Sequence, residues 1–192
     1  MFLEFIQSTW RATVFGLYGF QKFTKQAYLN TEKGFMRDAL DVDGQGKVVL
    51  VTGANSGLGF ATCKTLCERK FHVMMVCRNK ERGQEAVKSI QSQVAVCSLE
   101  LIILDLSRPK EIQNFVRNLP NDFSLAALVN NAGVLLNERT ETPEGLETVF
   151  ATNTLGVYYL TKLLLPCLPK SSRVINVSSA GMYNVPLDVD DL

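Results

Sequence analysis

Residues 47–59 read KVVLVTGANSGLG, an apolar run followed by a glycine-rich turn. The run has the composition of a buried strand, and a helix is expected to begin near Ser56–Gly57. A helix that begins after such a turn directs its free amides and its positive dipole end at one point. The stretch therefore predicts a strand–loop–helix corner that binds the pyrophosphate of a dinucleotide.

The glycines of this corner have separate expected roles. Gly53 permits the tight turn, Gly57 lets the backbone approach the phosphates, and Gly59 lets the helix pack close to the sheet. A loop of the GxxxxGK[ST] type is disfavoured because no Gly-Lys-Ser/Thr follows. The candidate phosphate-binding residues are Gly53, Asn55, Ser56, Gly57, Leu58 and Gly59.

After residue 46 apolar runs alternate with segments of helical pattern. Strands that are apolar on both faces and separated by helices predict a parallel sheet covered on both sides. The fold class expected is therefore α/β, a doubly wound parallel sheet (Rossmann fold) with strand order 3-2-1-4-5. The expected strands are 47–52, 71–77, 99–106, 125–131 and 172–179, and the expected helices are 57–70, 80–93, 108–119 and one or two within 143–168.

The end of the second strand is expected to select the cofactor. An acidic residue there would hold the ribose 2′-hydroxyl of NAD, but the chain has Arg78 and Asn79. Arg78 can pair with a 2′-phosphate, so NADP(H) is favoured over NAD(H); the alternative is a solvated arginine. Asp105, followed by Leu106, could meet the adenine amine, and it could also cap the next helix.

Composition excludes several classes of function. The 192 residues carry a formal net charge of +1, so nothing indicates a nucleic-acid partner. The single histidine, His72, excludes zinc sites built on several histidines, and no metal site is expected. Five cysteines without a Cys-x-x-Cys pair indicate reduced thiols, mostly buried, in an intracellular protein.

Residues 1–46 differ from the rest of the chain, and the expected domains are 1–46 and 47–192. Within 1–29, Phe2, Ile6, Trp10, Val14 and Leu17 follow helical spacing. Charged residues interrupt the run, so no bilayer-spanning stretch is expected. Two interpretations remain open: a helix that packs on the domain or covers its cleft, and a helix lying at a membrane surface with lysines near anionic lipid. A polar connector is expected over 30–46.

The ordered motifs resemble those of the short-chain dehydrogenase/reductase family across residues 47–181. TGANSGLG at 52–59 is similar to the family's nucleotide loop, and Asn130 opens its Asn-Asn-Ala-Gly motif. The resemblance implies that Asn130 lies beside the nicotinamide ribose and that Ala132 and Gly133 line the cofactor floor. It implies that Asn153 holds a water in a proton relay. It also implies that Ser179 polarises the substrate carbonyl while the cofactor transfers hydride.

A narrower likeness, to one subfamily, rests on four further features. They are the aromatic N-terminal segment, the dipeptide Cys77-Arg78, the run NTLGVY at 153–158 and the stretch RVINVSSAGM at 173–182.

The family's Tyr-x-x-x-Lys pair is not found where it is expected, a dozen or more residues after Ser179. Tyr183 has Leu187 four positions on, and the matches at Tyr158/Lys162 and Tyr18/Lys22 precede the serine. The chain is therefore expected to be truncated before that helix, with the fifth strand an uncovered edge. It would carry the cofactor half of a cytoplasmic oxidoreductase acting on a carbonyl or alcohol substrate, and would itself lack normal activity. The alternative is an inactive cofactor-binding module, or one forming a homodimer through residues 154–168.

Overall fold

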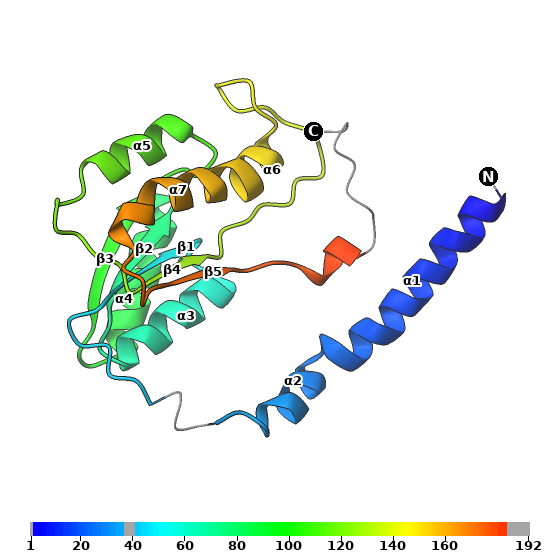
Figure 1. Cartoon of the computed structure of the whole chain (residues 1–192), viewed down its shortest axis with the longest axis horizontal. Coiled ribbons are helices and arrows are strands. Elements are labelled where there is room, and N and C mark those ends of the chain that lie inside the picture. The colour runs from blue at the N-terminus through cyan, green and yellow to red at the C-terminus, as the bar shows by residue number, and fades with distance from the viewer. Residues whose placement is uncertain (1, 37–40, 184–192) are drawn as a thin grey trace. The chain divides into compact units, whose positions relative to one another are not determined.

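The computed structural model describes residues 2–36 and 41–183, with side chains described for 10, 12–36 and 41–182. The chain divides into two compact units. One unit is Asp43–Val177, and the other combines Met1–Val42 with Ser178–Leu192 (Figure 1).

The larger unit is built on a five-stranded parallel sheet. Its strands are β1 (Val48–Thr52), β2 (His72–Cys77), β3 (Ser98–Ile103), β4 (Ala127–Asn130) and β5 (Arg173–Asn176). The strand order is β3-β2-β1-β4-β5, and every neighbouring pair is parallel. The expected doubly wound sheet and its order are confirmed, although β5 is shorter than the predicted strand.

Both faces of the sheet are covered by helices. Alternate side chains of β1 and β2 point to opposite faces, as the pleat requires. Val49, Val51 and Val73 pack with buried residues of α3 (Gly57–Glu68) and α4 (Lys80–Gln93). Leu50, Met74 and Val76 pack with α5 (Pro109–Arg117) and α7 (Val157–Leu164). Figure 1 shows α3 on one side of the sheet and α5 and α7 on the other.

One helical segment of changing pitch leads towards β5. It runs through α6 (Thr148–Phe150), a π-helical turn (Ala151–Gly156), α7 and a short 3₁₀ turn (Leu165–Cys167). Gly156 meets the Leu106 backbone carbonyl so closely that no side chain could fit between them. The widened turn therefore lies where the helix crosses the chain that leaves β3.

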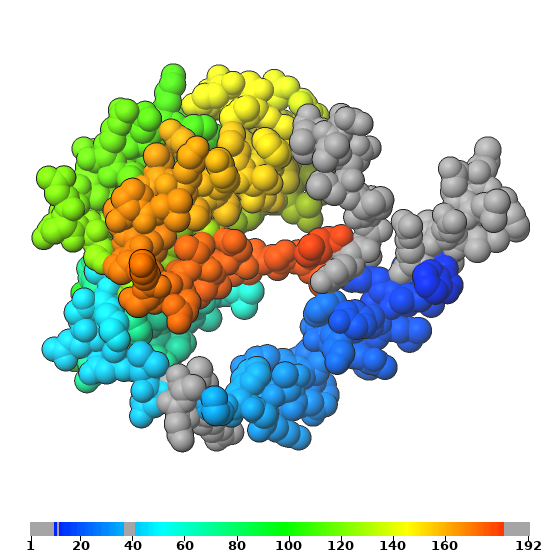
Figure 2. All heavy atoms as spheres, in the orientation of Figure 1, coloured from blue at the N-terminus to red at the C-terminus, as the bar shows by residue number. Residues whose placement is uncertain are grey.

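The outer strand β5 has one neighbour among the strands that the structure describes. All four of its residues are exposed, and within the described part of the chain it pairs with β4 alone. Atoms of this region are visible at the surface in Figure 2. Leu187, four positions after Tyr183, lies outside the described residues.

The N-terminal part holds two helices where the sequence pattern predicted one. They are α1 (Phe2–Lys22) and α2 (Lys25–Glu32). Thr24 ends the first by donating to the Phe20 carbonyl and caps the second by accepting from the Ala27 amide. This double role of a threonine side chain explains the break. The side chains of Phe2 and Ile6 lie outside the description.

Candidate cofactor-binding site

A groove of about 360 Å³ lies at the carboxyl ends of β1, β2 and β4. Ligands of doubly wound sheets bind at this edge of the sheet. Nine predicted cofactor residues line it, namely Gly53, Asn55, Ser56, Arg78, Asn79, Asp105, Leu106, Ala132 and Gly133. Five lining residues were not predicted, namely Val76, Arg82, Asn131, Val134 and Thr152. A larger cavity of about 720 Å³, between α5 and the sheet, holds none of the predicted site residues.

The turn after β1 needs its glycines for two different reasons. Gly53 has a φ of 63°, and a Cβ there would lie 2.8 Å from the Ala132 Cα. Gly57 has a φ of 55° with nothing within 4 Å of the position of a Cβ. Both values fall in the left-handed region that favours glycine. The open space at Gly57 leaves its backbone accessible, as its predicted role requires.

Gly59, predicted to let the helix pack close to the sheet, packs against the residues that directly follow two of its strands. A Cβ at Gly59 would lie 2.6 Å from Asn131 Nδ2 and closer still to the Gly53 carbonyl oxygen. The contact is therefore with the loop and the residue after β4, not with a strand. Leu58, between the two helical glycines, is 71% exposed and therefore contributes little to the packing of this helix start.

A hydrogen-bonded side chain holds the two halves of the corner together. The Thr52 hydroxyl accepts from the amides of Asn131 and Ala132, at 3.0 and 2.9 Å. Asn131 Nδ2 returns bonds to the carbonyls of Thr52 and Gly53. Sequence reasoning assigned Asn131 no role of its own, because these bonds join residues 78 to 80 positions apart in the chain.

Two arginines line the groove at the end of β2. Arg78 and Arg82 are both exposed, and neither forms an ion pair with any residue that the structure describes. Asn79 Oδ1 accepts from the Arg82 amide at 2.8 Å and so caps α4. The Asn79 oxygen is therefore already used, while both guanidinium groups keep their donors for a ligand.

The predicted capping role of Asp105 is wrong. The N-cap of α5 is Arg108, with Pro109 in the first turn, and it makes no side-chain cap bond. Asp105 Oδ1 instead accepts from the amide and the hydroxyl of Ser107, at 2.9 and 2.7 Å. The carboxylate forms a local turn that starts too early to reach α5. Asp105 also lines the groove, and this position is compatible with the predicted contact to an adenine amine.

The two predicted catalytic residues lie in different units. Asn153, in the π-helical turn, accepts from the Val134 amide and donates to the Val134 carbonyl, both at 2.8 Å. It therefore fixes the backbone of Val134, which lines the groove next to Ala132 and Gly133. Ser179 belongs to the smaller unit, where its hydroxyl accepts from the Gly181 amide at 3.1 Å. Asn130 is buried and does not line the groove.

The pair Tyr158/Lys162 lies on α7 with both side chains exposed. Lys162 Nζ lies 5.6 Å from the centre of the Tyr158 ring, a cation–π contact at the surface.

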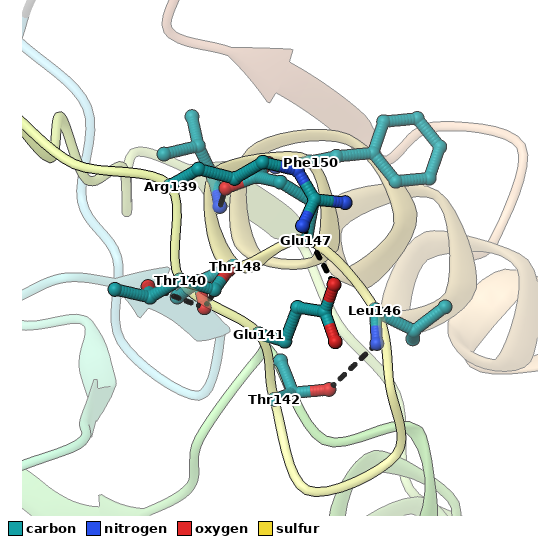
Figure 3. Close-up of polar contacts among 9 residues, drawn as sticks. Arg139, Thr140, Glu141, Thr142, Leu146, Glu147, Thr148 and Phe150 are labelled. Carbon is teal, nitrogen blue, oxygen red and sulfur yellow. Dashed lines mark hydrogen bonds and ion pairs between the residues drawn. The ribbon is translucent and has the colours of Figure 1, made fainter.

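The loop between β4 and α6 is ordered by its own polar contacts. Figure 3 shows Arg139 paired with Glu141, and Thr142 Oγ1 accepting from the Leu146 amide. Glu147 accepts from the amides of Phe150 and Val149, at 2.6 and 2.8 Å. These bonds favour the carboxylate and hold the pKa of Glu147 below its usual range. The first amides of α6 are therefore satisfied from within the chain.

Three of the thiols are buried around α3. Burial raises the pKa of Cys63 to about 12, and it also raises the pKa of Cys67 and of Cys77. All five cysteines are free, and Cys97 and Cys167 are half-buried. These three buried thiols therefore pack as small apolar groups.

A glycine loop opening a helix beside β1, with a groove across the neighbouring strand ends, defines a dinucleotide-binding α/β protein. The family model described as short chain dehydrogenase matches residues 47–187, and the chain belongs to this family. It is 43% identical over 175 residues to dehydrogenase/reductase SDR family member 12 of Bos taurus, covering 90% of this chain and 55% of the relative. It is 42% identical over 187 residues to the protein of the same name in Homo sapiens, covering 96% and 59%.

These relatives confirm the narrower likeness inferred from the motifs. Human retinol dehydrogenase 11 is 42% identical over 141 residues, covering 72% of this chain and 44% of the relative. The chain thus spans about half the length of the relatives it matches, from 44% to 59%.

Solved structures agree with the fold. A metagenomic short-chain oxidoreductase in complex with NADP is 27% identical with a TM-score of 0.60, covering 71% of this chain and 64% of its own. A short-chain dehydrogenase/reductase of Serratia marcescens is 26% identical with a TM-score of 0.63, covering 76% and 60%.

Proposed function

We propose that this chain carries the cofactor half of an oxidoreductase that transfers hydride between NADP(H) and a carbonyl or alcohol substrate. One observation carries the proposal: the uncapped start of α3 and the unpaired arginines Arg78 and Arg82 border the same groove. Amides at a helix start suit a pyrophosphate, and guanidinium groups suit a phosphate monoester. An NADP complex among the structural neighbours supports the same choice.

In this proposal some residues bind the cofactor and others take part in polarisation of the substrate and proton transfer. The loop 53–59 would hold the pyrophosphate, and the backbone of Ala132 and Gly133 would support the nicotinamide end. The cofactor, when bound, supplies the hydride. Ser179 would donate a hydrogen bond to the substrate carbonyl oxygen, and Asn153 would hold a water for proton transfer. The bond of Ser179 from Gly181 leaves the serine proton free to be donated.

The preference for NADP(H) is tested by titrating the 192-residue chain with NADPH and NADH and following nicotinamide fluorescence. We expect Arg78→Gln to weaken NADPH binding by about 10- to 100-fold, the range of a hydrogen bond to a charged group, and to leave NADH binding unchanged. Arg117→Gln, an exposed arginine on α5, is the matched control. Equal losses for both cofactors would show that Arg78 does not read the 2′-phosphate.

A second candidate is a cofactor-binding or dimerising module without catalysis. The exposed Tyr158 and Leu165, on or next to α7, favour a contact between copies through residues 154–168. Turnover separates the two candidates: NADPH-dependent reduction of a carbonyl by this chain, lost in Ser179→Ala, supports catalysis. Cofactor binding without turnover, together with a dimer in sedimentation, supports the module.

We also propose that the N-terminal helices bind the cytoplasmic surface of a membrane. Trp10 is 66% exposed and Phe20 is 76% exposed, and both lie on α1 with the exposed Leu17. Lys22, Lys25 and Lys33 outnumber the one acidic residue, Glu32, between residues 12 and 36. Exposed aromatic rings beside lysines are typical of helices at an anionic lipid surface. No helix within the described ranges is long and apolar enough to span a bilayer.

Flotation with vesicles tests this contact without reference to the enzyme. The chain should float with vesicles of mixed neutral and anionic lipid, and less at high salt, because lysine contacts are screened. The double variant Trp10→Ser/Phe20→Ser should stay at the bottom of the gradient. Ala12→Ser, at an exposed position of the same helix, is the matched control and should float like the unmodified chain. No flotation of the unmodified chain at low salt would refute the proposal.

A further inference from the structure

The carboxamide of Asn130 is buried at the end of β4 and joins three elements. The residue is 3% exposed, and Nδ2 donates to Asn176 Oδ1 at 2.8 Å and to Thr161 Oγ1 at 3.0 Å. Asn176 faces it across the sheet as its register partner on β5, and Thr161 comes from α7. The Val177 amide also donates to the Asn130 carbonyl at 2.9 Å. The ends of β4, β5 and α7 therefore meet at one amide group.

The orientation of this amide is determined by its neighbours. Asn130 Oδ1 is buried and has no hydrogen-bond partner among the residues that the structure describes. Turning the amide over would bury two unpaired N–H donors and bring two side-chain oxygens, those of Asn130 and Asn176, against each other. Unpaired buried donors cost free energy, so the observed orientation is the better of the two. The Asn176 oxygen thus accepts from a buried amide group and fixes its orientation.

Both strands of this junction lead into segments with predicted site residues. Residues 131–134, directly after Asn130, form part of the groove wall, and Ser179 follows Asn176 by three residues. We infer that Asn176 is a positioning residue which, with Thr161, orients Asn130 and thereby sets the cofactor floor. The inference rests on the proposed function, because it assumes that the groove binds a nicotinamide dinucleotide.

The test compares NADPH affinity among variants of the full 192-residue chain, at a temperature where each is folded by circular dichroism. Asn176→Ala removes the acceptor and should raise the dissociation constant roughly tenfold, the equivalent of one hydrogen bond. Asn176→Asp keeps an acceptor oxygen and should stay within about twofold of the unmodified chain at pH 7. Val174→Ala, also exposed on β5, is the control for general loosening of the strand and should not change affinity.

A second variant keeps the test decisive if Asn176→Ala does not fold. Thr161→Val preserves shape, removes the other acceptor and should weaken binding several-fold. The inference is overturned if Asn176→Ala behaves like Val174→Ala, or if Asn176→Asp does not restore affinity. It is also overturned if Thr161→Val binds like the unmodified chain. If the unmodified chain binds neither NADPH nor NADH, the proposed function fails and the inference fails with it.

Discussion

Two helix starts in the larger unit differ in whether their first amides have hydrogen-bond partners. At α6, the Glu147 carboxylate accepts from the amides of Val149 and Phe150. At α3, Ser56 makes no side-chain cap bond, and no group in the described part of the chain accepts from the amides of residues 57–59. The first start carries its own anion, and the second is open beside a groove.

The difference separates a structural helix start from a binding one. Both starts have the same need, because the first amides of any helix lack partners within it. A carboxylate from the chain meets the need permanently at α6, whereas the open start of α3 can be satisfied by the phosphates of a ligand. An uncapped start is therefore informative here because it coincides with glycines that keep the backbone accessible.

The largest expected effect comes from distorting the open start. Gly59→Ala would place a Cβ 2.6 Å from Asn131 Nδ2. We expect the free energy of unfolding to fall by about 1–3 kcal/mol, the usual cost of overpacking, and NADPH binding to be lost. Urea unfolding and fluorescence titration measure the two effects. Gly16→Ala on α1, with nothing within 4 Å, should cause neither loss. Unchanged affinity in Gly59→Ala would contradict the assigned geometry.

The next-largest effect is expected from giving α3 a carboxylate cap like the one that Glu147 provides at α6. Ser56→Asp would place a carboxylate where the pyrophosphate is expected. We expect the unliganded chain to gain about 0.5–1 kcal/mol from the new cap, and NADPH affinity to fall about tenfold or more by repulsion. Thermal melting of the unliganded variant measures the gain in stability, and NADPH titration measures the loss of affinity. Ser56→Asn, a neutral cap of similar size, should lose less affinity; equal losses would mean that charge is not the cause.

Removing the carboxylate cap of α6 should lower the stability of the fold without changing NADPH binding. Glu147→Gln removes the charge that the Phe150 and Val149 amides stabilise, so its melting temperature at pH 7 should fall by a few degrees. Because the folded pKa of Glu147 is lowered, its contribution is present above the ordinary value of about 4.3 and is lost as pH falls through the lowered value. Melting curves from pH 3 to 7 should therefore converge at the acidic end. A difference that is constant with pH would refute the role of the charge.

The smallest effect is expected at a side chain of the open start that points into solvent. Leu58→Ala should change the free energy of unfolding by less than about 0.5 kcal/mol, since the leucine is 71% exposed. NADPH affinity should stay within about twofold, because only the Leu58 amide is expected to meet the phosphates. The same titration measures it, and a larger loss would place the side chain against the cofactor.

The sequence predicted the local features of this site well. Hydrophobic periodicity located all five strands, and the strand–loop–helix context of residues 47–59 identified the corner. Other features depend on contacts between distant segments, and they were missed: the bonds of Asn131 to Thr52 and Gly53, and the place of Arg82 in the groove. The break at Thr24 and the turn at Asp105 were missed for another reason. In both, a polar side chain competes with the backbone for a bond, and pattern does not reveal which wins.

The sequence by itself determined the alternation of strands and helices, the glycine turn and the family, because these depend on local periodicity and on short motifs. Only the tertiary structure decided which groups are left unsatisfied. The open amides of α3, the unpaired Arg78 and Arg82, and the buried oxygen of Asn130 are each defined by what the rest of the fold does or does not bring near them. Hydrogen-bond satisfaction is a property of three-dimensional neighbours, and at α3 and the two arginines its absence marks where a ligand is expected to bind.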